Sequence, residues 1–116
     1  MEYAHGPRTR REVALTFHGA GDPAIVRDLL SIFAAHGATV TVLGVGTWLA
    51  ANHGIAREIV GMGHELGNHT YRHLDIDSLD AASARDEIVR CRDVLVSLVG
   101  SGGAHFRQSQ ARTATP

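Results

Sequence analysis

The sequence of 116 residues predicts an α/β fold built on parallel strands. Two short apolar runs, residues 12–17 (EVALTF) and 39–45 (TVTVLGV), have the β-branched and aromatic composition of buried strands. Between them, apolar side chains recur at helical spacing from Ile25 to Phe33. A unit of strand, helix and strand nearly always pairs its strands in parallel, because the helix crosses over the sheet between them. These observations favour the α/β class.

The first helix and the segment after the second strand have clear local signals. Asp22 is a good N-cap residue and Pro23 suits a first helical turn, so we expect the helix to begin there and to end near Gly37. Residues 47–62 carry apolar side chains at helical intervals, with a break near residues 52–54. This pattern predicts an interrupted helix.

The rest of the chain continues the alternation of strands and helices. Residues 64–68 predict a third strand, and residues 104–107 predict the start of a fourth. A long amphipathic helix is expected to begin at Asp80. Its inward stripe consists of Ile88, Cys91, Leu95 and Leu98. We divide the chain into a flexible lead-in (residues 1–11), a domain (residues 12–110) and a tail (residues 111–116).

The composition argues against several classes of protein. A formal net charge of −1 gives no electrostatic reason to expect nucleic acid or membranes as partners. No run approaches the roughly 18 to 20 apolar residues of a membrane span, and residues 1–12 lack the apolar stretch of a secretory signal. Taken literally, the sequence predicts a cytoplasmic protein. The single cysteine, Cys91, excludes an internal disulfide and is expected to be a small core residue.

Eight histidines in so short a chain raise the expectation of metal or proton chemistry. His69 and His73 stand four residues apart, which on a helical turn would place both imidazoles on one side, close enough to share a divalent cation. The alternative is a pair of surface histidines. The pair follows a predicted strand, and α/β folds place their sites at the carboxyl ends of strands, so we favour the metal site.

Three segments stand out: GHELGNHTYRHLDIDSL (residues 63–79), VALTFHGAGDP (residues 13–23) and HFRQSQ (residues 105–110). Together they resemble the motifs of the polysaccharide deacetylases, the NodB-homology or carbohydrate esterase family 4 group. Residues 63–79 are similar to the second motif, whose two histidines bind metal in that family. Residues 13–23 lie where the family has a strand ending in T-F-D-D-G-P, and residues 105–110 resemble the third motif. The resemblance implies the N-terminal portion of a partial, distorted (β/α) barrel of the deacetylase type.

The same resemblance implies an activity and a set of site residues. The expected reaction is a metal-dependent hydrolysis that removes N-acetyl groups from a carbohydrate polymer, with a divalent metal, zinc foremost, bound by His69 and His73. An N-acetylated polysaccharide is the expected partner. Arg107 corresponds to the arginine that orients the general base. Family members commonly act on extracellular or cell-envelope polymers.

The first motif departs from the family pattern. His18 stands at the position of the general-base aspartate, and Gly19 stands at the position of the metal-binding aspartate. His18 and Asp22 are therefore the candidates for the third metal ligand. His18 is also suited to act as the general base, since an imidazole does either near neutral pH. Asp22 has the competing role of helix cap.

The sequence leaves three functional classes open, and with them the question whether this chain catalyses anything. The first is the hydrolase, for which no general acid is assigned. The second is a non-catalytic descendant that binds metal or glycan. The third is a truncated barrel without an activity of its own, whose open edge would be exposed unless a homo-oligomer covers it.

Overall fold

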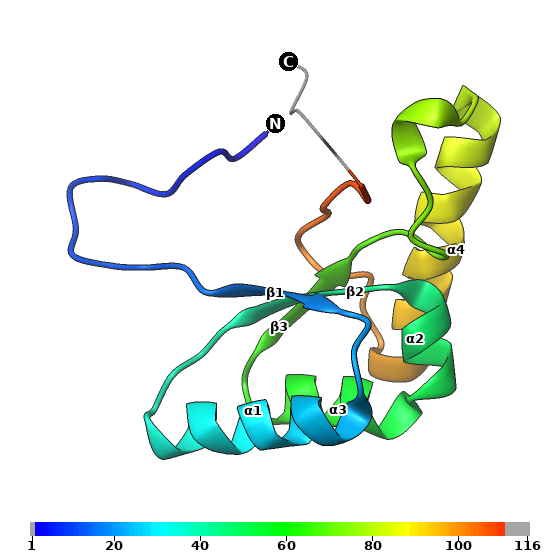
Figure 1. Cartoon of the computed structure of the whole chain (residues 1–116). Helices are drawn as coiled ribbons and strands as arrows, with labels where there is room; N and C mark the ends of the chain where they lie inside the picture. The colour runs from blue at the N-terminus through cyan, green and yellow to red at the C-terminus, as the bar shows by residue number, and fades with distance from the viewer. Residues whose placement is uncertain (1, 111–116) are drawn as a thin grey trace.

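The computed structural model describes residues 2–110 and confirms the α/β class (Figure 1). Three strands alternate with four α-helices and one short 3₁₀-helix. In chain order the elements are β1 (Thr16–Gly19), α1 (Pro23–Ala35), β2 (Thr41–Gly44), α2 (Gly46–Ala51), α3 (His53–Gly61), β3 (Glu65–Asn68), η1 (Ile76–Ser78) and α4 (Ala81–Val99).

The strands form one parallel sheet in the order β1, β2, β3. The register aligns Phe17 with Val42 and Leu66, and these three side chains pack into the apolar core on one face. Because side chains alternate along a strand, the neighbouring residues His18 and Leu43 belong to the opposite face. The sheet therefore has one face covered by helices and a second face without helices among residues 2–110, which we call the open face; there His18 is exposed, whereas Leu43 is 2% exposed.

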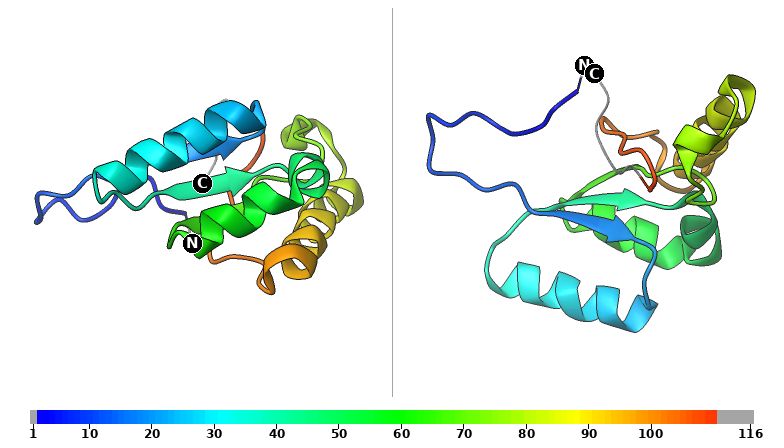
Figure 2. Two further views of the ribbon diagram at one scale, coloured as in Figure 1. Left: turned by 90° about the horizontal axis from the view of Figure 1, so that it is seen from below. Right: turned by 45° about the horizontal axis from the view of Figure 1, so that its top comes forward.

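The helices cover one face and one flank of the sheet. Helices α1 and α3 lie along the same face, and α4 stands beside α2 at the carboxyl end of the strands (Figures 1 and 2). The core between these layers centres on the fully buried residues Leu49, Ile55, Ile59 and Leu95. Cys91 is also fully buried, as predicted, and burial raises the pKa of its thiol to about 11.

Several element boundaries differ from the sequence prediction. The first strand begins at Thr16, because the backbone ladder with β2 starts at the bond from the Thr41 amide to the Leu15 carbonyl (3.1 Å). Val13 has no strand beside it and is 84% exposed. The fourth strand is reduced to one isolated parallel bridge between Phe106 and Asn68. The interrupted helix is confirmed, since Asn52 separates α2 from α3.

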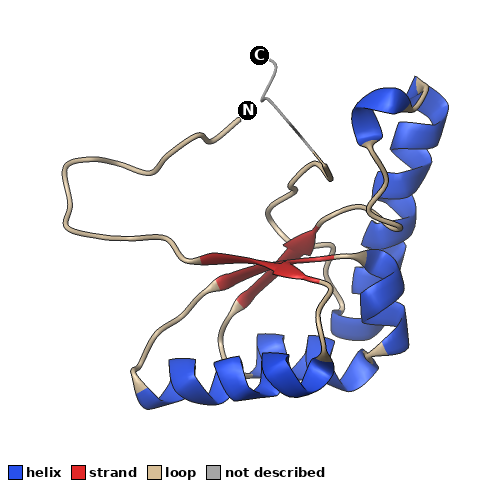
Figure 3. Cartoon of the chain, in the orientation of Figure 1, coloured by secondary structure: helices blue, strands red, loops and turns tan. Residues whose placement is uncertain are grey.

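The two ends of the domain differ in what the structure shows. Residues 2–15 contain neither helix nor strand and are exposed, and they extend away from the sheet as a long loop (Figure 3). The predicted tail, residues 111–116, lies outside the described residues. β1 pairs only with β2 among residues 2–110, so a homo-oligomer formed through that edge stays a prediction. Helices long and apolar enough to cross a membrane are absent from residues 2–110.

Candidate metal centre

Three histidines meet at the carboxyl end of the sheet. His18 lies in β1, and His69 and His73 follow β3. One ring nitrogen of each lies within 4.8 Å of the others. The ring of His18 stacks on that of His73, with centroids 4.5 Å apart, and both meet the ring of His69 edge to face. Parallel pairing of β1, β2 and β3 brings these distant parts of the sequence together.

The two histidines of the HxxxH motif are not on a helical turn. They lie in an irregular segment, residues 69–73, which we call the metal loop. Thr70 and His73 have left-handed backbone angles, with φ of 67° and 56°. Such angles in residues other than glycine cost roughly 1 to 3 kcal/mol each and persist only where the surroundings enforce them. These angles interrupt any regular helical turn, so the two histidines come together through the shape of the loop.

Two polar side chains of the loop region hold its backbone. The Asn68 carbonyl oxygen Oδ1 accepts from the Thr70 amide at 2.9 Å, and Thr70 Oγ1 accepts from the His73 amide at 3.2 Å. Both side chains therefore bond to the backbone of their own segment. They shape the loop and thereby place His73.

His69 is oriented by the segment after α4. Its Nδ1 lies 2.8 Å from the backbone carbonyl of Arg107, and it is 4% exposed. Because a carbonyl only accepts hydrogen bonds, Nδ1 carries the proton and Nε2 keeps a free lone pair. A metal-binding histidine commonly donates its other nitrogen in this way, which fixes both the ring and its tautomer.

The electrostatics of the cluster favour uncharged imidazoles. Burial, followed by the charges of His73 and Arg107, lowers the pKa of His18. Burial also lowers the pKa of His69; the bond to the Arg107 carbonyl opposes this, and the neighbouring charges reinforce it. Metal ligands must be deprotonated, so the lowered pKa values of His18 and His69 favour the binding of a cation.

The three imidazoles fit zinc. Catalytic zinc sites commonly use three protein ligands and leave a fourth position open, and three histidines are one of the known sets. Two nitrogens bound to the same tetrahedral zinc are about 3.3 Å apart, given bond lengths of roughly 2.0 to 2.1 Å. The ligand nitrogens of the three histidines lie within 4.8 Å of one another, so a bound zinc ion would draw them closer together.

Comparison with known proteins identifies the family. The family model described as polysaccharide deacetylase matches residues 5–113. The chain belongs to the polysaccharide deacetylase family. Residues 13–110, which carry the three motifs seen in the sequence, fall within that match.

Individual deacetylases of the family show the same relationship. The chain is 33% identical over 79 residues to a chitooligosaccharide deacetylase of Bradyrhizobium sp. (strain ANU 289), a match covering 68% of this chain and 36% of that protein. It is 30% identical over 95 residues to a peptidoglycan-N-acetylglucosamine deacetylase of Bacillus cereus, covering 82% and 34%. The chain thus spans about a third of the length of these relatives.

A solved structure of a deacetylase has the same fold as this chain. The crystal structure of the Bc1960 peptidoglycan N-acetylglucosamine deacetylase superposes with a TM-score of 0.86 at 28% identity, over 90% of this chain and 49% of that one. The partial barrel predicted from the family motifs is therefore the fold of this chain.

Asp22, a predicted third ligand, acts as a helix cap in the structure. Its Oδ1 accepts from the Ala24 amide at 2.9 Å at the start of α1. No carboxylate among residues 2–110 shares the close spacing of the three histidines. His18 is the candidate that the geometry brings to His69 and His73.

Gly19, which the resemblance places at the position of a metal-binding aspartate, has little space for a side chain. A Cβ at this position would lie 2.9 Å from Val42 Cγ1, 3.0 Å from a ring carbon of Trp48 and 3.2 Å from the Gly44 Cα. The family position is therefore filled by core packing instead of a carboxylate. Trp48 belongs to the core, and its indole donates to the Gly21 carbonyl.

Arg107 reaches the site from its predicted segment. Its guanidinium donates to Thr16 Oγ1 at 2.9 Å, beside β1, and its charge acts on His18 and His69. A role in orienting a general base stays a prediction. Of the other histidines, His64 is buried and its Nδ1 accepts from the Val40 amide.

Sequence reasoning missed Glu87, which is 1% exposed in the middle of α4. Both of its oxygens accept hydrogen bonds from Arg72 in the metal loop. Burial acts to raise the pKa of this carboxyl, but the bonds from Arg72 outweigh it and hold the pKa below the ordinary value. The available signal was its spacing, since residues 87, 91 and 95 share one side of a helix.

Proposed function

We propose that this chain is a metal-dependent hydrolase domain that removes N-acetyl groups from a carbohydrate polymer. The carrying observation is the cluster of His18, His69 and His73, with ligand nitrogens within 4.8 Å at the carboxyl end of a parallel sheet. Family membership supports the reaction type, and the two relatives named above, which act on chitooligosaccharide and peptidoglycan, support an N-acetylated glycan as substrate.

Each of the three histidines supplies one nitrogen ligand to the proposed metal site. His69 supplies a fixed donor because the Arg107 carbonyl holds its ring, and His73 supplies a second donor from the strained loop. His18, exposed on the open face, supplies the third. A divalent cation bound there would act as a Lewis acid toward an acetamide carbonyl and a water molecule. The Arg107 guanidinium, whose charge acts on His18 and His69, would orient the general base.

His18 has two candidate roles, ligand and general base, and metal content separates them. We expect the purified, size-fractionated protein to contain nearly one equivalent of zinc by plasma mass spectrometry. His69→Ala and His73→Ala should lose it, and His18→Ala should also lose most of it if His18 is a ligand. A His18→Ala protein that keeps its zinc but releases acetate on the order of 10²-fold more slowly would instead identify the base.

The matched control is His36→Ala, which removes an exposed imidazole at the end of α1 and should change neither zinc content nor activity. Activity is measured as acetate released from chitooligosaccharides and from peptidoglycan. A folded parent protein that binds no zinc would contradict the proposed centre.

A second candidate function rests on the missing carboxylate. Because Gly19 stands where the family has an aspartate, the chain is also suited to bind metal or glycan without turnover. This alternative predicts stoichiometric zinc and glycan retention, without acetate release from either substrate.

A further inference from the structure

The metal loop requires an external support. Its residues Thr70 and His73 keep left-handed backbone angles that neither residue type favours. Bonds made only within the loop, such as the one from the His73 amide to Thr70 Oγ1, move with the loop and do not fix it to the rest of the molecule. An anchor on a rigid element is needed to hold His73 beside His18.

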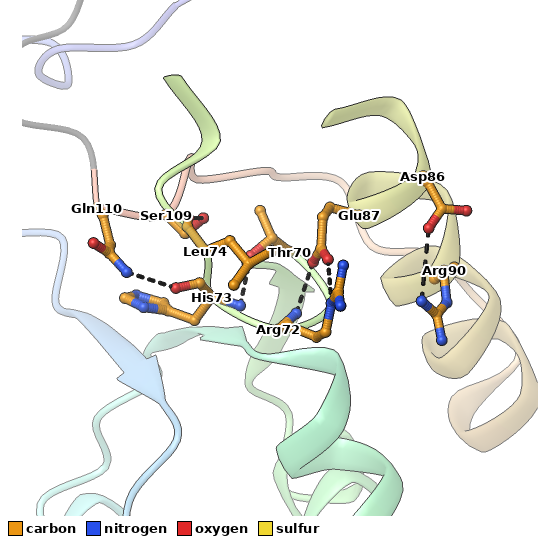
Figure 4. A network of polar contacts seen from close by, with 9 residues as sticks. All are labelled: Thr70, Arg72, His73, Leu74, Asp86, Glu87, Arg90, Ser109 and Gln110. Carbon is orange, nitrogen blue, oxygen red and sulfur yellow. Dashed lines mark hydrogen bonds and ion pairs between the residues drawn. The ribbon is translucent and has the colours of Figure 1, made fainter. Parts of the chain in front are cut away.

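We propose that Glu87 of α4 is a positioning residue of the metal centre, which presets the metal loop so that His73 is ready to bind the cation. Its Oε2 accepts from the Arg72 amide and its Oε1 accepts from Arg72 Nε, both at 2.7 Å (Figure 4). The Arg72 amide directly precedes His73 in the chain. This inference rests on the proposed metal site.

Glu87 is buried, and its bonds to Arg72 are what make a buried carboxylate tolerable at this place in the fold. A carboxylate removed from water is strongly unfavourable unless it is paired and hydrogen-bonded. Glu87 is 1% exposed, whereas its partner side chain Arg72 is 53% exposed. The helix that carries it spans Ala81–Val99 and packs on α2, α3 and β3, so the carboxylate has a fixed position. The loop is therefore tied to the core through one buried charge.

Other groups hold the remaining sides of the loop. The carbonyls of Thr70 and Tyr71 accept from the amides of Gly46 and Thr47 at the start of α2. The Gln110 side-chain amide donates to the His73 carbonyl at 2.9 Å, and Figure 4 shows it approaching from the side opposite Glu87. Within this set Glu87 is the ionised group and the partner of the Arg72 amide, so its loss frees the peptide next to His73.

A neighbouring ion pair provides a comparison on the same helix. Asp86 and Arg90 are four residues apart, with 3.6 Å between their charged atoms, and both side chains are about half exposed. Such an exposed pair contributes little to stability, and neither carboxylate oxygen of Asp86 is bonded to the loop in Figure 4. Asp86→Asn is therefore the matched control for Glu87→Gln.

The experiment measures zinc affinity by competition with a chromophoric chelator, together with hydrogen exchange of the Arg72 amide in the metal-free protein. Glu87→Gln turns one acceptor into an NH₂ group that faces an Arg72 donor. We expect a 10- to 100-fold weaker zinc affinity, the usual scale for groups that orient metal ligands, and faster exchange at Arg72. Asp86→Asn should match the parent in both.

Ile59→Val distinguishes a general loss of stability from a specific effect on the metal loop, because Ile59 is a core residue outside that loop. This variant should lower Tm and leave the zinc affinity of the folded protein unchanged. A folded Glu87→Gln protein with the parent's zinc affinity would overturn the inference. If Glu87→Gln does not fold, Arg72→Ala carries the test, with a smaller but measurable loss expected and an unchanged affinity overturning it.

The outcomes also separate this inference from the proposed function. A parent that binds zinc but releases no acetate ends the proposed reaction and leaves the role of Glu87 standing. A parent protein that binds no zinc would contradict both the proposed reaction and the positioning role of Glu87.

Discussion

At the scale of single residues, an imidazole replaces a carboxylate at the end of β1. His18 lies on the open face of the sheet, whereas Gly19 lies against the core. Three neutral nitrogens leave the charge of a bound dication uncompensated, in contrast to a set that includes an aspartate. Imidazole ligands suit zinc, copper, iron and nickel, while carboxylates suit magnesium, calcium and manganese. Three imidazole ligands therefore favour zinc, copper, iron or nickel over magnesium, calcium or manganese.

Gly19→Asp tests whether the family's carboxylate is restorable. The Cβ of the new side chain would lie 2.9 Å from Val42 Cγ1 and 3.0 Å from a ring carbon of Trp48, so both neighbours would have to shift; we expect a loss of stability of about 1 to 3 kcal/mol, typical of overpacking, and no gain in zinc affinity. Urea unfolding and zinc titration measure the two effects. His18→Asp, a change at the exposed neighbour, should stay close to the parent in stability. A Gly19→Asp protein that is stable and binds zinc more tightly would contradict this account.

At the scale of elements, the sequence predicted correctly those features that depend on residues close together in the chain. The capping residues of α1 and α4, Asp22 and Asp80, and the interruption at Asn52 are features of neighbouring residues. The limits of β1 depend instead on where its partner β2 begins, which no local pattern contains. Likewise, the sequence identified His69 and His73 as a pair but not the left-handed angles that place them. Glu87 escaped notice because its partner is 15 residues away.

The capping role of Asp22 gives a prediction at this scale. Asp22→Ala removes the acceptor for the Ala24 amide at the start of α1, and we expect a loss of about 1 kcal/mol in the free energy of unfolding. Zinc content should not change, because the histidine cluster does not include this carboxylate. Asp22→Ser, which keeps a capping oxygen, should restore most of the stability. Zinc lost from Asp22→Ala at full folding would instead make Asp22 a ligand.

At the scale of the whole molecule, the metal site exists only in the folded chain. His18 and His69 come from opposite edges of the sheet and meet through the pairing of both strands with β2. Their environment lowers the pKa of each below its ordinary value of 6.5. Folding therefore makes both imidazoles harder to protonate, and the unfolded chain binds more protons than the folded one in the range just below that value. Proton binding and folding are thus linked through the site.

The sign of this linkage predicts how stability depends on pH. Because the unfolded chain takes up more protons, the free energy of unfolding of the zinc-free protein should fall as the pH is lowered from 7.5 to 5.5. The pKa of Glu87 is lowered from its ordinary value of 4.5, so its titration affects stability only at pH values below the range from 7.5 to 5.5. Urea unfolding at the two pH values measures the change, and a His18→Gln, His69→Gln double variant should reduce it. With zinc present the decline should steepen, since protons compete with the metal for the same nitrogens. An equal decline in parent and double variant would place the responsible groups elsewhere.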